Sequence, residues 1–143
     1  MDLNASFTQP MRDELTRLGF TELRTAEDVE RDLGPATGTA LVFVNSVCGC
    51  AAGMARPGTA LALARTAARP DRLLTVFAGQ DPEATARARK KFGPIPPSSP
   101  SVALLKDGAL VAFVPRHAIE GRSAEAVAAV LVEALEEHCV PAS

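Results

Sequence analysis

Two stretches of the chain are continuously apolar and rich in β-branched residues. They cover Ala40–Asn45 and Arg72–Phe77, and such runs are typical of strands that are buried on both faces of a sheet. A third apolar segment covers Val102–Leu105, and the turn Lys106-Asp107-Gly108 connects it to Ala109–Val114. These last two segments therefore predict a β-hairpin.

The pattern of polar and apolar residues before the first strand predicts two helices. The first covers Gln9–Leu18, where Met11 and Leu15 recur at helical spacing. The second begins at Thr25, a capping residue that has an acid three positions further on, and it stops at Gly34-Pro35.

Three more helices are expected after the first strand. The longest covers Ser46–Arg69, and Pro57 should kink or interrupt it. The next helix is capped by Asp81 and runs to about Phe92. Ser123 caps the final helix, in which apolar residues again recur at helical spacing.

The order of these elements predicts the fold class. After residue 40 the order is strand, helix, strand, helix, loop, hairpin, helix. Two strands joined by a helix run parallel with a right-handed crossover, and the hairpin adds antiparallel strands to the same sheet. We therefore expect a single thioredoxin-like α/β domain over residues 1–143, a three-layer sandwich with a mixed central sheet and helices on both faces. Its core would cover about 39–143, and about 1–38 would form an N-terminal helical extension.

Composition and charge exclude several classes of function. The formal net charge is −2, and the chain has six Phe but no Tyr or Trp. It therefore lacks the basic surface that binds a phosphate backbone and the aromatic platform on which bases stack, so we expect no nucleic-acid partner. The chain has no run of about 18 apolar residues to span a membrane. Because Met1–Phe20 also lacks the apolar centre of a signal peptide, we expect a cytoplasmic protein with reduced thiols.

Cys48, Gly49 and Cys50 lie where the first buried strand ends and a helix begins. Free backbone N–H groups and the helix dipole stabilise a thiolate at such a position, which lowers the pKa of a cysteine. Cys48 is outermost on the turn and is the expected nucleophile, while Cys50 is the expected resolving or supporting thiol. Gly49 lets the backbone bend sharply between them. The alternative interpretation is a pair of buried structural cysteines.

Two other positions are expected to border this site. Ser99-Pro100 directly precedes the hairpin, and a proline there in a thioredoxin-like fold packs opposite the cysteine turn. The cis form of an X–Pro bond costs only about 0.5–1 kcal/mol, so we expect Pro100 to be cis and to shape the substrate groove with Ser99. The alternative is an ordinary proline-rich surface loop. Arg56, beyond the cysteines, is a candidate contact for the carboxylates of a small thiol.

The rival class of function is a metal-binding or metal-carrier module that uses Cys48 and Cys50 with a histidine. Zinc sites commonly need four ligands, and this chain offers one close thiol pair and the distant His117 and His138. Such a site would have to form between two chains. Cys139, near the end of the last helix, is expected to be a peripheral thiol without a catalytic role.

The segment Val44–Pro57, which reads VNSVCGCAAGMARP, resembles the signature of the bacilliredoxin family, thioredoxin-like proteins of bacteria that use the small thiol bacillithiol. Further similar segments are Pro10–Thr16, Phe77–Asp81, Pro96–Ser101, Leu105–Gly108 and Pro115–Arg122. Together they extend over nearly the whole chain. The departures are Met54, where the family frequently has Asn, and a shorter N-terminus. Neither departure affects the cysteines.

The resemblance implies a thiol–disulfide oxidoreductase that removes bacillithiol from S-bacillithiolated cytosolic proteins, with some disulfide isomerase activity. Weak thioredoxin-type reductase activity is expected on separate grounds, because a Cys-x-Cys disulfide closes a smaller and more strained ring than a Cys-x-x-Cys disulfide. Cys48 would attack the mixed disulfide, release the protein thiol and become S-bacillithiolated. Free bacillithiol, or Cys50, would then resolve this adduct. Bacillithiol is thus the implied co-substrate, its reductase system is an implied partner, and we expect no tightly bound cofactor and no metal.

Overall fold

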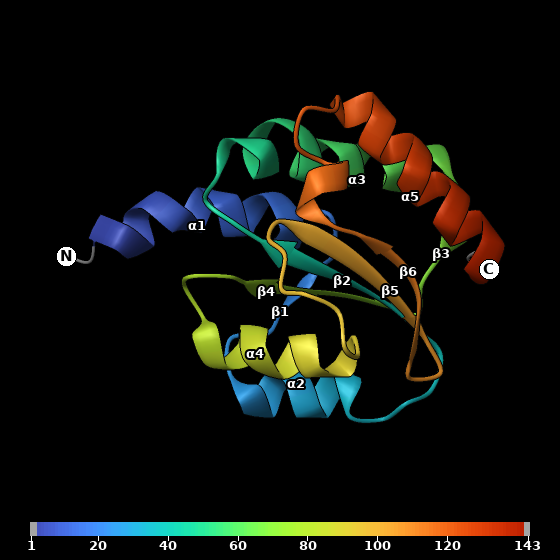
Figure 1. Cartoon of the computed structure of the whole chain (residues 1–143), viewed down its shortest axis with the longest axis horizontal. Coiled ribbons are helices and arrows are strands. Elements are labelled where there is room, and N and C mark those ends of the chain that lie inside the picture. Colours follow the sequence, from blue (N-terminus) through green and yellow to red (C-terminus); the bar gives the residue numbers. More distant parts are fainter. Residues whose placement is uncertain (1–2, 142–143) are drawn as a thin grey trace.

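A five-stranded mixed sheet forms the centre of the computed structural model, which describes residues 3–141 (Figure 1). Its strands are β1 (Thr21–Glu22), β2 (Thr39–Asn45), β4 (Arg72–Phe77), β5 (Ser101–Lys106) and β6 (Ala109–Val114). In space they follow the order β1-β4-β2-β5-β6. The first three strands in this order run parallel, and β5 and β6 are antiparallel to their neighbours. The predicted combination of a parallel pair and an antiparallel hairpin is therefore confirmed.

Helices cover both faces of this sheet (Figure 1). One face carries α1 (Leu3–Thr16), α3 (Arg56–Arg65) and α5 (Ala124–His138), and the other face carries α2 (Ala26–Leu33) and α4 (Pro82–Lys91). A short π-helical segment, η1 (Ala51–Ala55), precedes α3, and a 3₁₀ turn, η2 (Arg116–Ala118), follows β6. This arrangement confirms the three-layer α/β fold with helices on both faces.

The side chains of β2 explain why the molecule has two apolar cores. Leu41 and Phe43 belong to the core under α3 and α5, whereas Ala40, Val42 and Val44 belong to the core under α2 and α4. Successive side chains of a strand point to opposite faces, so a continuously apolar strand needs helices on both sides. All residues of β2 are buried, as the sequence predicts.

Two helix caps and one hairpin turn form where the sequence predicts them. Thr25 caps α2 through a reciprocal pair of hydrogen bonds with Asp28. Ser123 caps α5 by accepting a backbone hydrogen bond. The hairpin turns at Asp107 and Gly108, which have φ angles of 50° and 84°. Two positive φ angles are what a tight two-residue hairpin turn requires.

The predicted long helix over Ser46–Arg69 is wrong in its extent. The π-helical segment η1 ends and α3 begins immediately before Pro57, so the expected interruption falls at this proline. A proline fits the first turn of a helix because N–H groups there have no intrahelical partner. The helix then ends at Arg65, and Ala68–Arg69 form a short strand, β3, that pairs with β7 (Val140–Pro141).

The N-terminal region also differs from the expectation. Its helix begins at Leu3 rather than Gln9 and contains Pro10. The two-residue strand β1 pairs with β4, so this region contributes an edge strand to the main sheet. Within residues 3–141, no helix combines the length and the apolar character needed to cross a membrane.

Candidate active site

Cys48 and Cys50 lie in the turn between β2 and η1, at the predicted transition from strand to helix. Cys48 is partly exposed, whereas Cys50 is buried. Their sulfur atoms lie 2.6 Å apart, and both cysteines are free thiols. One thiol can therefore donate a hydrogen bond to the other sulfur atom, which makes the protonation states of the two residues interdependent.

The surroundings of the two thiols shift their pKa values in opposite directions. Burial raises the pKa of Cys48, but hydrogen bonds from the thiol of Cys50, the hydroxyl of Ser46 and two backbone N–H groups outweigh burial and lower it overall. Burial raises the pKa of Cys50, and the hydrogen bond to Cys48 and its negative charge raise it further. Cys48 is therefore both the more accessible thiol and the one that ionises first, as a nucleophilic cysteine must.

Arg116 brings a positive charge to this pair of thiols. It begins η2, two positions after the last residue of β6, and its charge favours ionisation of Cys50. The negative charges of Cys50 and Cys48 in turn raise the pKa of Arg116. Sequence reasoning missed this residue, because only the register of β6 against β5, and of β5 against β2, places the end of β6 near the end of β2.

The segment Ser99-Pro100 lies at the same end of the sheet as the cysteine turn. The next residue, Ser101, pairs with Val44 of β2 in the antiparallel register, and the cysteine turn begins after Asn45. The peptide bond between Ser99 and Pro100 is cis. The register therefore brings together the two loops that the sequence reasoning assigns to one site.

Arg56 is directed into the protein and not toward a ligand. Its side chain is 3% exposed, and its Nη1 donates hydrogen bonds to Asn45 Oδ1 at 2.9 Å and to the carbonyl of Ser46 at 3.1 Å. Its Nε forms an ion pair with Glu14 at 2.6 Å. These interactions do not support the prediction that Arg56 contacts a small thiol. The guanidinium is instead engaged in hydrogen bonds to Asn45 and Ser46, at the start of the cysteine turn.

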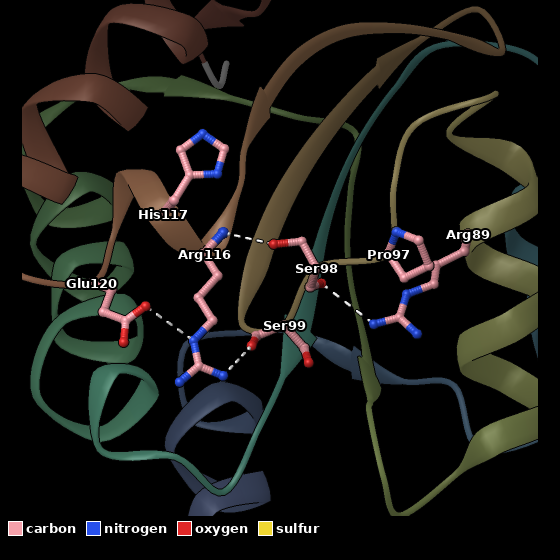
Figure 2. A pocket seen from close by; sticks show the side chains of 7 residues that line it. All are labelled: Arg89, Pro97, Ser98, Ser99, Arg116, His117 and Glu120. Atoms are coloured by element: carbon pink, nitrogen blue, oxygen red, sulfur yellow. Dashed lines mark hydrogen bonds and ion pairs between the residues drawn. The ribbon is translucent and has the colours of Figure 1, made fainter.

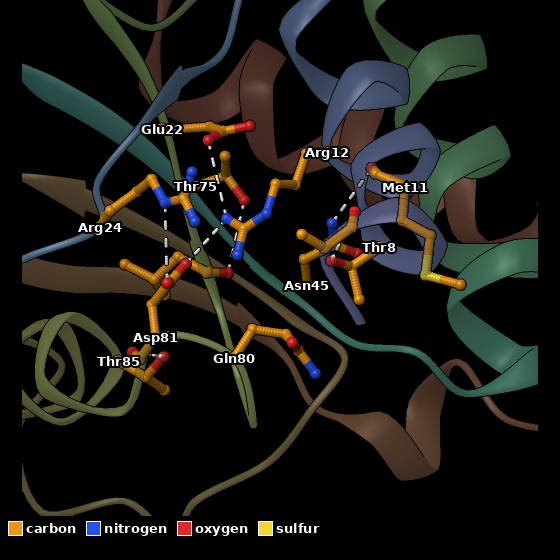
Figure 3. A network of polar contacts seen from close by, with 12 residues as sticks. Thr8, Met11, Arg12, Glu22, Arg24, Asn45, Thr75, Gln80, Asp81 and Thr85 are labelled. Atoms are coloured by element: carbon orange, nitrogen blue, oxygen red, sulfur yellow. Dashed lines mark hydrogen bonds and ion pairs between the residues drawn. The ribbon is translucent and has the colours of Figure 1, made fainter. Parts of the chain in front are cut away.

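Asn45 extends this polar network to the first helix. Its Nδ2 donates a hydrogen bond to the carbonyl of Met11 at 3.2 Å (Figure 3), and its Oδ1 also accepts from the backbone N–H of Ser46 at 3.0 Å. The amide thus connects α1, the end of β2 and the buried Arg56. The backbone that leads into the cysteine turn is therefore held by hydrogen bonds to α1 and to Arg56 of α3.

Cys139 lies apart from the two thiols. Cys139 is buried near Thr39, which begins β2, so it lies at the opposite end of this strand from the cysteine turn. Burial raises the pKa of its thiol. His138 lies near the end of α5. Within residues 3–141, no group of three or more His, Cys, Asp or Glu side chains is arranged to bind a metal ion.

Comparisons with known proteins agree with this geometry. The family model described as disulphide isomerase matches residues 3–139. The chain is 54% identical over 138 residues to a bacilliredoxin of Geobacillus kaustophilus, covering 96% of this chain and 95% of that protein. It is 59% identical over 128 residues to a bacilliredoxin of Symbiobacterium thermophilum, covering 90% of each.

Solved structures with low sequence identity share the fold. The thioredoxin of Fasciola hepatica matches with a TM-score of 0.55 at 22% identity, over 83% of this chain and 99% of that one. The thioredoxin of Malassezia sympodialis matches with a TM-score of 0.55 at 11% identity, over 83% and 90%. The fold is therefore the thioredoxin fold. The match to the disulphide isomerase family, together with the pair of adjacent thiols, defines a thiol–disulfide oxidoreductase. Within that class, the chain belongs to the bacilliredoxin family.

Proposed function

We propose that this protein removes bacillithiol from S-bacillithiolated proteins by thiol–disulfide exchange at Cys48. The observation that carries the proposal is the asymmetry of the thiol pair. Cys48 is accessible and has a lowered pKa, and Cys50, in contact with it, is buried and has a raised pKa. The name bacilliredoxin, which both relatives carry, supports bacillithiol as the small thiol.

The first step exchanges one disulfide bond for another. The thiolate of Cys48 attacks the bacillithiol sulfur of the mixed disulfide, and a bond forms between that sulfur and Cys48 Sγ. The original S–S bond breaks, and the protein thiolate leaves and takes up a proton. The number of disulfide bonds is unchanged, so this step needs no external oxidant or reductant.

The second step removes bacillithiol from Cys48. Once Cys48 is in a disulfide it carries no charge, so one of the effects that raise the pKa of Cys50 is gone, while Arg116 still favours the Cys50 thiolate. Cys50 then attacks Cys48 Sγ and releases bacillithiol as its thiolate, leaving an internal disulfide. Alternatively, a free bacillithiol thiolate attacks the bacillithiol sulfur of the adduct, which forms the disulfide of bacillithiol and frees the Cys48 thiolate. The same attack by Cys48 on a mispaired protein disulfide gives disulfide isomerase activity.

Intact-mass spectrometry with a bacillithiolated peptide tests this proposal. In the wild type we expect release of the peptide thiol. Cys48→Ala should release none, because the nucleophile is gone. Cys50→Ala should still release the peptide and accumulate one bacillithiol on Cys48, because the internal resolving thiol is missing. Cys139→Ser is the matched control and should behave as the wild type, since Cys139 lies at the other end of β2.

Two results would contradict the proposal. If Cys48→Ala still formed the adduct and Cys50→Ala did not, the roles of the two thiols would be reversed. If the purified protein held one equivalent of zinc or iron that survived dialysis and disappeared in Cys48→Ser, the metal-carrier function would replace the redox function.

A further inference from the structure

An open hollow of about 440 Å³ lies at the end of the sheet that carries the cysteine turn. Its walls come from α4, from the loop before β5 and from the segment after β6 (Figure 2). Arg89 and Arg116 enter it from opposite sides of the segment Ser98–Ser99 (Figure 2). Two guanidinium groups thus face one small space that neither the cysteines nor the core occupies.

The guanidinium of Arg89 has unused hydrogen-bonding capacity. Its Nε is buried and has no hydrogen-bond partner, and its Nη2 makes one long hydrogen bond of 3.4 Å to the carbonyl of Ser98. Among residues 3–141 it forms no ion pair with a carboxylate within 4.0 Å, and burial lowers its pKa. A partly buried cation without a counter-charge is costly, and a ligand carboxylate would supply both the charge and the acceptor.

The guanidinium of Arg116 is also held by long contacts. Its Nη1 lies 3.4 Å from the carbonyl of Ser99, and its Nε lies 3.3 Å from Glu120 Oε2. The Glu120 side chain is 58% exposed, so solvent screens this pair and it holds Arg116 only weakly. The hollow is lined by Ser99, and the strand register places this loop at the end of the sheet that carries the cysteine turn. The charge of Arg116 also acts on Cys48 and Cys50, so an anion bound here would lie within electrostatic reach of the two thiols.

We propose that this hollow binds a carboxylate of the small thiol while the sulfur of that thiol is bonded to Cys48. The inference rests on the proposed function, and it assigns Arg89 and Arg116 as the residues that recognise the small-thiol half of the mixed disulfide. Arginine suits this task, because its planar fork of N–H donors matches the two oxygen atoms of a carboxylate.

The hollow also sets which sulfur Cys48 attacks. A mixed disulfide has two sulfur atoms, and attack on the protein sulfur would leave the protein on Cys48 and release the small thiol. With the carboxylate of the small thiol held beside Arg116, its own sulfur is the one presented to Cys48. The bond then forms to the small-thiol sulfur, and the protein leaves as the free thiolate, which is the outcome that a repair reaction needs.

The test compares two mixed disulfides of the same peptide, one with bacillithiol and one with the uncharged 2-mercaptoethanol. The rate constant for release of the peptide thiol is measured for each, and their ratio is compared among variants. Leaving-group chemistry is the same for every variant, so a change in the ratio reports recognition. Arg89→Gln should lower the ratio about tenfold, the equivalent of one charge-assisted hydrogen bond. Arg89→Lys, which keeps the positive charge, should have a ratio close to that of the wild type.

Arg87→Gln is the matched control variant. It removes the same charge from the same helix, but Arg87 pairs with Glu30 and does not line the hollow. Its ratio should equal that of the wild type. Arg89 is the better target than Arg116, because Arg116 also changes the ionisation of Cys50.

A second measurement follows the direction of attack. On the Cys50→Ala background, intact-mass spectrometry shows which half of the bacillithiol disulfide remains on Cys48. We expect the small thiol, and we expect Arg89→Gln to increase the fraction that carries the peptide. An unchanged ratio and an unchanged adduct in Arg89→Gln would overturn the inference, as would an equal fall of the ratio in Arg87→Gln.

These outcomes separate the inference from the proposed function. If the wild type released no peptide from either disulfide, the proposed function itself would fail. If it released the peptide from both, and Arg89→Gln left the ratio unchanged, exchange would stand without recognition in the hollow. If Arg89→Gln instead slowed the 2-mercaptoethanol disulfide of an acidic peptide, the hollow would serve the protein partner and the inference would be wrong.

Discussion

Cys48 and Cys50 lie only two positions apart, but their surroundings shift the pKa values of their thiols in opposite directions. The deciding contact is the one between their sulfur atoms, 2.6 Å long, in which the protonated Cys50 stabilises the thiolate of Cys48. Hydrogen bonding to the charged form of a group lowers the pKa of a thiol, and hydrogen bonding from its protonated form raises it. This one hydrogen bond therefore favours the thiolate form of Cys48, which is the nucleophile, and the protonated form of Cys50.

The first prediction concerns the pH dependence of alkylation of Cys48 by iodoacetamide. Only the thiolate reacts, so the rate falls as the pH decreases through the pKa of Cys48. Because this pKa is lowered, we expect the midpoint below that of a cysteine in an unfolded peptide, measured under the same conditions. Cys50→Ala removes the hydrogen-bond donor and should move the midpoint to higher pH.

Cys50→Ser is the control for this shift, because its hydroxyl can still donate a hydrogen bond to Cys48. Its midpoint should lie nearer to that of the wild type than to that of Cys50→Ala. Equal midpoints in the Ala and Ser variants would show that the Cys50 thiol does not stabilise the Cys48 thiolate. Mass spectrometry of the alkylated peptides identifies which cysteine has reacted.

At the scale of elements, the cysteine turn is held by a buried arginine from the helix that follows it. Arg56 contacts the side chain of Asn45 and the carbonyl of Ser46, and Asn45 in turn contacts α1. A strand end, a loop and two helices thus share one polar network. The network fixes Ser46, whose hydroxyl helps to stabilise the Cys48 thiolate.

The second prediction is that Arg56→Ala both destabilises the protein and alters the thiol. The change leaves Asn45 Oδ1 and the carbonyl of Ser46 without this buried donor, a loss of about 1–3 kcal/mol in the free energy of unfolding. The Glu14 pair adds little, because Glu14 is 46% exposed. Urea unfolding measures the loss, and the alkylation midpoint of Cys48 should increase.

Arg65→Ala is the control for this prediction, since Arg65 pairs with an exposed glutamate on the surface. Its effect on stability should be small, and it should leave the alkylation midpoint unchanged. A destabilised Arg56→Ala protein with an unchanged midpoint would show that the network supports the fold without tuning the thiol.

The elements with a clear local signal could be predicted from the sequence, and those defined by a partner could not. Ala40–Asn45 is apolar on both faces and is recognisable alone, whereas Thr21–Glu22 is a strand only because β4 lies beside it. The same holds at the site. The cysteine pair follows from its place after a strand, but Arg89 and Arg116 are 27 positions apart, and no sequence spacing indicates that they share a hollow.

At the scale of the whole molecule, an electrostatic network ties the two helical layers together around the edge of the sheet. Arg12 of α1 pairs with Asp81, which precedes α4, at 2.8 Å and with Glu22 of β1 at 3.6 Å (Figure 3). Its guanidinium also lies over the ring of Phe77 at 4.9 Å. Because α1 and α4 cover opposite faces, this one side chain joins both layers to the edge strand β1.

The third prediction is that Arg12→Met lowers the free energy of unfolding by about 3–5 kcal/mol, because it leaves the nearly buried Asp81 without its closest cation. Asp81→Asn should not weaken the capping of α4, because the Asp81 side chain forms no cap hydrogen bond to this helix. The double variant Arg12→Met/Asp81→Asn removes the unpaired charge as well and should be more stable than Arg12→Met alone. Urea unfolding of the four proteins in this cycle measures the coupling. If the two single losses simply add, Arg12 and Asp81 act independently, and the layers are held together by apolar packing instead.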